Sequence, residues 1–270
     1  MGEGISPFAI TAWRFLIGGL VILPFAIKQG TEHRIKLSLS SILTLGALGI
    51  LNVVISMLLL QLAIYNGKAS LTAVIVSMNP LFVSIFAYSI IKENLSRHQI
   101  YSILMGVTGL LVIILGESEL RGQGFNNLPL GIVYAILAGI TFALYTVLTK
   151  RAVFQFGNRI TNCTSFLIGG LSLSLLNLLI GKNMAFEPNM RNILLILYLG
   201  VVITGIAYLF YFEAMKELSA ARASIYFFLK PGLASIMAFL FLKEHLSIIQ
   251  VTGIVLIMFA LSRRIWMKHI

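Results

Sequence analysis

The chain has 270 residues, of which 59% are hydrophobic and 11% are charged, and its mean hydropathy is +0.97. Soluble domains carry about 25% charged residues, so this composition excludes a soluble globular protein. The net charge of +11 does not indicate nucleic-acid binding, because the basic residues lie between apolar blocks and form no basic stripe with interleaved aromatic residues.

Apolar blocks of about twenty residues follow one another along the chain, and this is the length that a helix needs to cross roughly 30 Å of hydrocarbon. They predict an all-α integral membrane protein. The nine predicted transmembrane helices are residues 7–27, 40–65, 69–91, 98–115, 128–149, 160–181, 192–215, 219–242 and 247–265. The longest polar interval, 116–127, is predicted to be a linker.

An internal repeat relates the two sides of this linker. Phe15–Leu20 recurs as Phe166–Leu171, an offset of 151 residues. The same offset relates Pro80 to Pro231, Ser84 to Ser235, Ala87 to Ala238, Lys92-Glu93 to Lys243-Glu244 and Gln99 to Gln250. A constant offset across four spans predicts two duplicated domains, 1–115 and 128–265. The first has four helices and the second five, so we expect that a first helix is missing from a ten-helix parent.

The distribution of lysine and arginine predicts the orientation. With a cytoplasmic C-terminus, thirteen of these residues fall in inside segments and five in outside segments, and Arg14 and Lys230 lie within spans. This excess follows the positive-inside rule and predicts a multi-pass protein of the cell membrane. Because the second half then enters the membrane from the opposite side to the first, the two repeats are predicted to be inverted (4+5).

Short motifs are present in both halves, and those of the proline and the Lys-Glu pair have a counterpart in the second half. Ser6-Pro7-Phe8 precedes Trp13-Arg14-Phe15-Leu16, and Asn79-Pro80 leads to Lys92-Glu93-Asn94-Leu95. Leu229-Lys230-Pro231 leads to Leu242-Lys243-Glu244-His245-Leu246. These motifs resemble those of EamA-type members of the drug/metabolite transporter superfamily, and the resemblance covers essentially the whole chain. It implies a ten-helix inverted repeat that moves amino acids, nucleotide-related metabolites or amphipathic drugs.

Two spans contain a proline near their middle, Pro80 after Asn79 and Pro231 after Lys230. A proline frees the carbonyl four residues earlier, and transporter sites tend to form where helices are broken near the midplane. The alternative interpretation is a packing kink without a ligand.

Three charged residues within spans are candidate transport residues. Lys230 lies at the middle of its span, where a lysine is costly, so it either faces a watery cavity or bonds to carbonyls. Arg14 either extends to the outer surface or binds a substrate carboxylate or phosphate. Glu213, together with Lys230, is a candidate for proton coupling.

Uncharged residues complete the candidate set. Asn79, Tyr145, Tyr208 and Tyr226 are predicted to line a cavity, although tyrosines also occupy membrane interfaces. Asn52, Gln61, Asn162 and Asn177 are more typical of hydrogen bonds between helices.

The sequence contains no nucleotide-binding glycine loop, no metal-binding histidine pair and no hydrolase elbow, so neither a cofactor nor a metal is expected. We therefore predict a secondary transporter, an exporter or exchanger that works by alternating access. The alternatives are a truncated or non-transporting protein of the same fold and a membrane-embedded enzyme. The expected partners are a small-molecule solute and the lipid bilayer but not nucleic acid, and a homodimer is left open.

Overall fold

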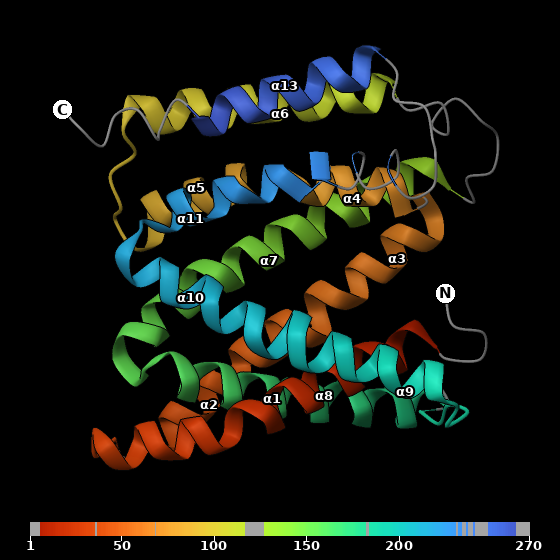
Figure 1. Ribbon diagram of the computed structural model, residues 1–270. Coiled ribbons are helices and arrows are strands. Elements are labelled where there is room, and N and C mark those ends of the chain that lie inside the picture. The colour runs from red at the N-terminus through yellow and green to blue at the C-terminus, as the bar shows by residue number, and fades with distance from the viewer. Residues whose placement is uncertain are drawn as a thin grey trace. The chain divides into compact units, whose positions relative to one another are not determined.

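The computed structural model describes residues 6–35, 37–67, 69–116, 127–181, 184–230 and 248–262, together with 232–233, 236 and 240 (Figure 1). Every regular element in these residues is helical, which confirms the predicted all-α membrane fold. Within the described residues, five helices are long and apolar enough to cross a membrane: Pro7–Glu32, Leu39–Gly67, Leu128–Phe156, Asn158–Leu179 and Met190–Glu217. Shorter apolar helices occupy Ile75–Ile90, Arg97–Ile113 and Val251–Ala260.

The described chain forms two compact units, and each contains segments from both sides of the linker. Unit 1 consists of Met1–Gln61 and Leu148–Glu217, and unit 2 of Leu62–Val147 and Leu218–Ile270. The compact units therefore do not coincide with the predicted repeats 1–115 and 128–265, and the duplication stays a prediction from the sequence. Most of the predicted linker, residues 117–126, lies outside the described residues.

Unit 1 contains the elements of four of the predicted spans. They are α1 (Pro7–Glu32), α2 (Leu39–Gly49), η1 (Ile50–Ser56), most of α3 (Met57–Gly67), the end of α7 (Leu128–Phe156), α8 (Asn158–Leu179), α9 (Met190–Leu197), η3 (Tyr198–Ile206) and α10 (Ala207–Glu217). α7 is longer than the predicted 128–149, and its last turns include Lys150. It ends at Gly157, whose φ of 84° is a left-handed conformation that glycine adopts readily.

The two copies of the repeated motif, Phe15–Leu20 and Phe166–Leu171, pack against each other in unit 1, where α1 and α8 lie side by side (Figure 1). A Cβ on Gly19 would lie 2.8 Å from Leu167, and one on Gly170 would lie 2.9 Å from Leu16. Since the order of contacts reverses, α1 and α8 are antiparallel. Small residues at such a crossing let helix backbones approach closely in a membrane.

A second pair of glycine contacts continues this symmetry. A Cβ on Gly169 would lie 2.6 Å from the carbonyl oxygen of Gly49, and one on Gly18 would lie 3.1 Å from that of Gly200. Adding 151 to 18 and 49 gives 169 and 200. The contact of Gly18 with Gly200 is therefore the repeat-related counterpart of the contact of Gly169 with Gly49. This symmetry supports the proposed duplication.

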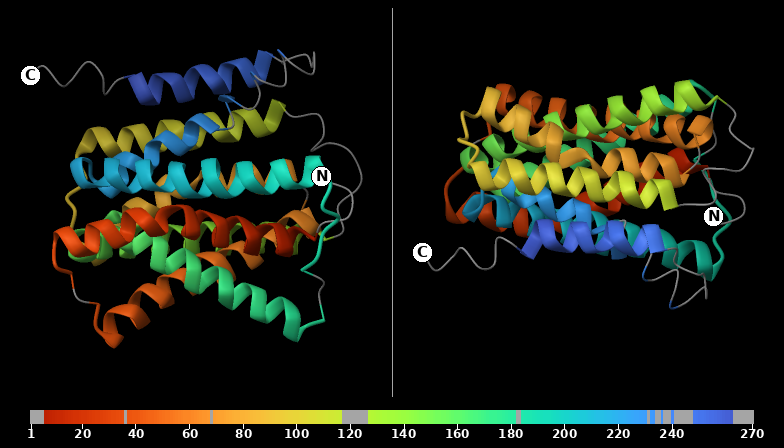
Figure 2. Two further views of the ribbon diagram at one scale, coloured as in Figure 1. Left: turned by 60° about the horizontal axis from the view of Figure 1, so that its bottom comes forward. Right: turned by 90° about the horizontal axis from the view of Figure 1, so that it is seen from above.

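Unit 2 contains the remaining described helices. They are α4 (Ala69–Ser77), α5 (Asn79–Ile90), α6 (Arg97–Gly116), the first part of α7, α11 (Ala220–Ile225), η4 (Tyr226–Phe228) and α13 (Ile248–Ser262). Figures 1 and 2 show α13 beside α6. A Cβ on Gly109 would lie 2.8 Å from Ile257, and one on Gly253 would lie 2.6 Å from Ile113, so this pair is also antiparallel.

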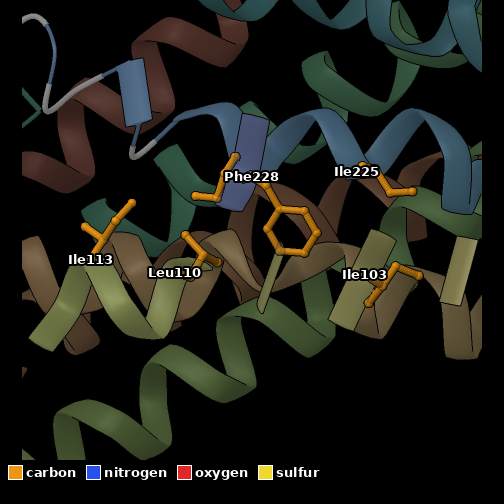
Figure 3. Close-up of a cluster of buried hydrophobic side chains, with 6 residues drawn as sticks. Ile103, Leu110, Ile113, Ile225 and Phe228 are labelled. Atoms are coloured by element: carbon orange, nitrogen blue, oxygen red, sulfur yellow. The ribbon is translucent and has the colours of Figure 1, made fainter. Parts of the chain in front are cut away.

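A hydrophobic cluster joins α6 to the neighbouring helices of unit 2 (Figure 3). Its buried members are Ile103, Leu110, Ile113, Ile225, Phe228 and Ile257. The ring of Phe228 lies against Gly106, where a Cβ would overlap it. The cluster therefore fixes the short α11–η4 segment, which leads to Lys230.

Candidate functional site

Two π-helical segments lie at the centre of long helices in unit 1. η1 spans Ile50–Ser56 within Leu39–Gly67, and η3 spans Tyr198–Ile206 within Met190–Glu217. The offset of 151 carries residues 50–56 onto 201–207, so the two segments overlap in the repeat. π-Helical turns are rare and often mark functional sites. Hydrophobic periodicity gave no signal of them.

Arg14 extends from α1 toward the chain that follows η1. Its Nη2 lies 3.2 Å from the Sδ of Met57, and its Cζ lies 4.8 Å from the centre of the Phe15 ring. The Nε is buried and has no hydrogen-bond partner among the described residues. A thioether is a weak acceptor, and an unpaired donor of a charged group is costly to bury. The Nε of the guanidinium is thus a buried donor that the described residues leave unused.

Polar side chains from both π-helical segments and α10 lie in the same unit. Asn52 of η1 is fully buried, and neither polar atom of its side chain makes a well-formed hydrogen bond within the described residues. Tyr208 of α10 lies close enough to interact with both Arg14 and Asn52. The Thr204 hydroxyl, one turn before Tyr208, is also buried without a described partner. Arg14, Tyr208 and Asn52 thus form a polar cluster in unit 1 whose hydrogen bonds are incomplete among the described residues.

Aromatic rings form one side of this cluster. Phe15 and Phe166, which the repeat offset relates, have ring centres 5.1 Å apart, and Tyr208 lies 6.1 Å and 5.1 Å from them. Phe212 lies 6.3 Å from Tyr208. Edge-to-face packing of this kind restricts the rings, so the phenol of Tyr208 has a fixed position beside Arg14.

Glu213 belongs to a different polar group, at the end of α10. Its Oε2 accepts a hydrogen bond of 2.8 Å from the Nδ2 of Asn158, and its Oε1 lies 2.8 Å from the Nζ of Lys216. Asn158 is buried and also binds Asn162 and the Leu209 carbonyl. Sequence reasoning missed Asn158, since an asparagine next to a glycine is typical of a helix start.

The other candidate residues lie in unit 2. The Nζ of Lys230 lies 3.9 Å from the centre of the Phe227 ring, a cation–π contact. The ring of Phe142 lies 6.1 Å from that of Phe227 and 6.0 Å from that of Tyr145. An aromatic row thus connects buried Tyr145 to Lys230, while Tyr226 is 54% exposed. Pro231 lies outside the described residues.

The helix of the first proline motif is interrupted beside that proline. α4 ends at Ser77 and α5 begins at Asn79, with Met78 as a turn between them. The Asn79 side chain is 1% exposed and has no hydrogen-bond partner among the described residues. The break thus places an amide without a described partner inside unit 2, whereas the cluster around Arg14 belongs to unit 1.

The Lys92-Glu93 motif has a structural role in unit 2. The Oε2 of Glu93 accepts a hydrogen bond of 2.8 Å from the amide of Ala220, and the Nε2 of Gln99 lies 3.0 Å from the Ser219 hydroxyl. A carboxylate is favourable at a helix N-terminus, and Ala220 begins α11. The counterpart, Lys243-Glu244, lies outside the described residues.

Comparison with known proteins agrees with the resemblance seen in the motifs. Residues 1–115 and 129–262 match the model of the EamA-like transporter family. An uncharacterized transporter of Clostridium kluyveri is 36% identical over 94% of this chain and 81% of its own length. Protein PecM of Dickeya dadantii is 28% identical over 80% of this chain and 71% of its own length. A chloroplastic WAT1-related protein of Arabidopsis thaliana is 24% identical over 92% of this chain and 60% of its own length.

A solved crystal structure shows the same fold. It superposes with a TM-score of 0.80 over 97% of this chain and 90% of its own length, at 19% sequence identity. The match extends over both compact units.

Proposed function

The chain belongs to the EamA-like transporter family and is a multi-pass membrane transporter, and from this premise we propose that it carries small metabolites bearing a carboxylate or phosphate. It is a secondary carrier that works by alternating access, as an exporter or exchanger. Amino acids and metabolite or drug-like solutes with such a group are its substrate classes.

The proposal rests on Arg14. A guanidinium binds carboxylate and phosphate through paired, charge-assisted hydrogen bonds. The buried Nε, the weak contact with Met57 and the unused amide of Asn52 leave donors for one anionic group. Tyr208 adds a hydroxyl beside it. A purely structural arginine would be expected to use these donors on carbonyls or carboxylates of the protein.

Alternating access needs two packings of similar energy. The symmetric contacts of α1 with α8, and the two π-helical segments beside them, supply related elements that can exchange roles. Within this scheme the halves 1–115 and 128–265 are inverted repeats, and the C-terminus is cytoplasmic.

We assign coupling to the proton gradient to Lys230 in preference to Glu213. Lys230 contacts an aromatic ring within a span and forms no ion pair with a described residue, and an apolar setting favours a neutral amine. The Glu213 carboxylate already binds Asn158 and Lys216. Asn79, Tyr145 and Tyr226 are proposed to line the solute pathway in unit 2.

The solute class is tested with purified protein in liposomes. A thermal-shift screen of amino acids and nucleotide sugars selects a solute, and its flux is compared with that of the analogue whose carboxylate or phosphate is removed. The anionic solute is expected to move at least about tenfold faster, because one charge-assisted hydrogen bond contributes roughly 1.5–3 kcal/mol. Equal flux of both contradicts the anionic assignment, and binding without flux indicates the non-transporting alternative.

The coupling assignment is tested with Lys230→Met and Lys230→Arg in the same liposomes. Lys230→Met is expected to abolish net transport while leaving membrane insertion intact. Lys230→Arg retains the charge but cannot release a proton, so it should keep exchange of labelled solute and lose the dependence on a pH gradient. Wild-type flux in Lys230→Met removes Lys230 from the mechanism.

Orientation is tested with Asn94→Cys and His245→Cys in a Cys163→Ala background. An impermeant thiol reagent should label position 94 only from the cytoplasmic face and position 245 only from outside. Labelling of both from one face contradicts the inverted arrangement.

A further inference from the structure

A groove of about 370 Å³ lies on unit 1 between α1, the start of α8 and the η3–α10 helix. Pockets that bind small molecules measure about 300–1,000 Å³, so the groove can hold part of a ligand. Its lining residues are Val21, Ile22, Phe25, Asn158, Arg159, Gly205, Ile206, Leu209, Phe210 and Glu213. Seven of them are apolar, and the three polar ones come from the first residues of α8 and the end of α10.

The polar end of the groove carries a positive charge. The Glu213 carboxylate pairs with Lys216 at 2.8 Å, accepts a hydrogen bond of 2.8 Å from the Asn158 amide and also interacts electrostatically with Arg159. Arg159 is exposed and makes no close ion pair with any described residue. Two cations, Lys216 and Arg159, thus face one carboxylate, so the excess charge at this end of the groove is positive.

The direction of the groove follows that of the helices. α8 begins at Asn158 and α10 ends at Glu217, so the polar residues lie where these spans end. The Gln29 Oε1 accepts a hydrogen bond of 3.3 Å from the Ile160 amide, which brings the last turns of α1 to the same level. From Glu213 back to Gly205 the apolar floor extends roughly 12 Å along the helix, at about 1.5 Å per residue. The groove thus runs from the membrane surface toward its middle.

We propose that this groove binds an anionic phospholipid, with one acyl chain along the apolar floor and the phosphate beside Arg159. Basic pockets between transmembrane helices are suited to anionic headgroups. Phe25 and Phe210 are 53% and 74% exposed on unit 1, which fits walls that contact lipid. The site is distinct from the cluster around Arg14, because Phe210 and Tyr208 lie on opposite sides of α10.

The headgroup is tested by native mass spectrometry of the full chain released from nanodiscs. These contain phosphatidylglycerol and phosphatidylcholine with the same acyl chains. Wild type should retain phosphatidylglycerol preferentially. Arg159→Gln should weaken this retention about fivefold, since one basic residue near an anionic headgroup contributes about 1 kcal/mol. Arg151→Gln, which removes an exposed arginine outside the groove, is the control and should leave retention unchanged.

The acyl-chain part is tested by filling the groove. Ile206→Trp should lower retention of phosphatidylglycerol, whereas Ile203→Trp should not, although Ile206 and Ile203 lie in the same helix and are 42% and 37% exposed. Size-exclusion chromatography confirms that both variants fold. Equal retention of the two lipids by wild type overturns the proposal, as does an equal effect of variant and control. A lipid-free dimer that Ile206→Trp dissociates also overturns it, because a second copy would then cover the groove.

Discussion

The two sides of unit 1 share their glycine packing but differ at the repeat-related position of Arg14. α1 and α8 cross through the same glycines, but the offset of 151 pairs Arg14 of α1 with Ser165 of α8. Ser165 is buried, and its hydroxyl donates a hydrogen bond of 2.9 Å to the Leu45 carbonyl. Arg14 has a buried Nε without a described partner. One copy of the position completes the packing, and the other leaves a buried donor unused among the described residues.

The largest effect should follow from removing the Arg14 side chain, with removal of the Ser165 hydroxyl as the comparison. Arg14→Met is expected to lower transport of an anionic solute about a hundredfold, because it removes charge-assisted hydrogen bonds of roughly 1.5–3 kcal/mol. Ser165→Ala should change transport less than about threefold and act mainly on stability. Initial rates in liposomes with equal amounts of inserted protein provide the measurement. Similar losses in both variants would show that the two positions are equivalent.

The shared packing itself is tested by a glycine pair. A Cβ on Gly49 would overlap the Ser165 carbonyl oxygen, whereas one on Gly200 would lie 2.6 Å from the Cγ2 and 2.7 Å from the Cβ of Ile17, which is a smaller overlap. Gly49→Ala is expected to reduce the free energy of unfolding by about 2 kcal/mol, and Gly200→Ala by less, since overpacking costs roughly 1–3 kcal/mol. Thermal unfolding in detergent would measure both. A larger loss for Gly200→Ala would contradict the contact geometry.

Substitution of Asn52 is expected to affect solute binding and the free energy of unfolding in opposite directions. The offset pairs this buried amide with Ile203. Asn52→Leu should weaken solute binding about tenfold, through the loss of one hydrogen bond to a charged group. The same change should raise the free energy of unfolding by about 1 kcal/mol, because it removes a buried and poorly bonded amide. A variant that binds normally but unfolds more easily would identify Asn52 as structural.

The smallest effect is expected at Glu213, which lies away from Arg14. Its side chain is 57% exposed in the pair with Lys216, and exposed pairs contribute about 0–1 kcal/mol. Glu213→Gln should therefore lower the free energy of unfolding by less than about 1 kcal/mol and leave flux within about twofold of wild type. If Glu213→Gln lost flux while its stability was unchanged, Glu213 would be the better candidate for proton coupling.

The helical membrane fold could be predicted from sequence because apolar length and charge position report directly on the bilayer. The duplicated Phe15–Leu20 motif indicated a repeat, but that its two copies cross in α1 and α8 became visible only in the structure. α7 was predicted too short, because Lys150 and Arg151 ended the apolar run before Gly157 ended the helix.

The site was only partly predictable. Arg14 and Tyr208 were both candidates, and the structure places them together in unit 1. Lys230, Asn79, Tyr145 and Tyr226 lie in unit 2. The contributions of Asn52, Met57 and Thr204 depend on how the π-helical turns rotate side chains relative to a regular helix, and no apolar pattern encodes that rotation. Glu93 was noticed as part of a motif, but its hydrogen bond to Ala220 joins positions far apart in the sequence.

Equilibrium binding of an anionic solute to Arg14→Met tests the central claim most directly. The solute is the one selected by thermal shift, and calorimetry in detergent compares wild type, Arg14→Met and Ser165→Ala. We expect the dissociation constant to rise about a hundredfold in Arg14→Met alone, and binding of the uncharged analogue to be the same in all three proteins. An unchanged dissociation constant in Arg14→Met would show that the anionic group binds elsewhere.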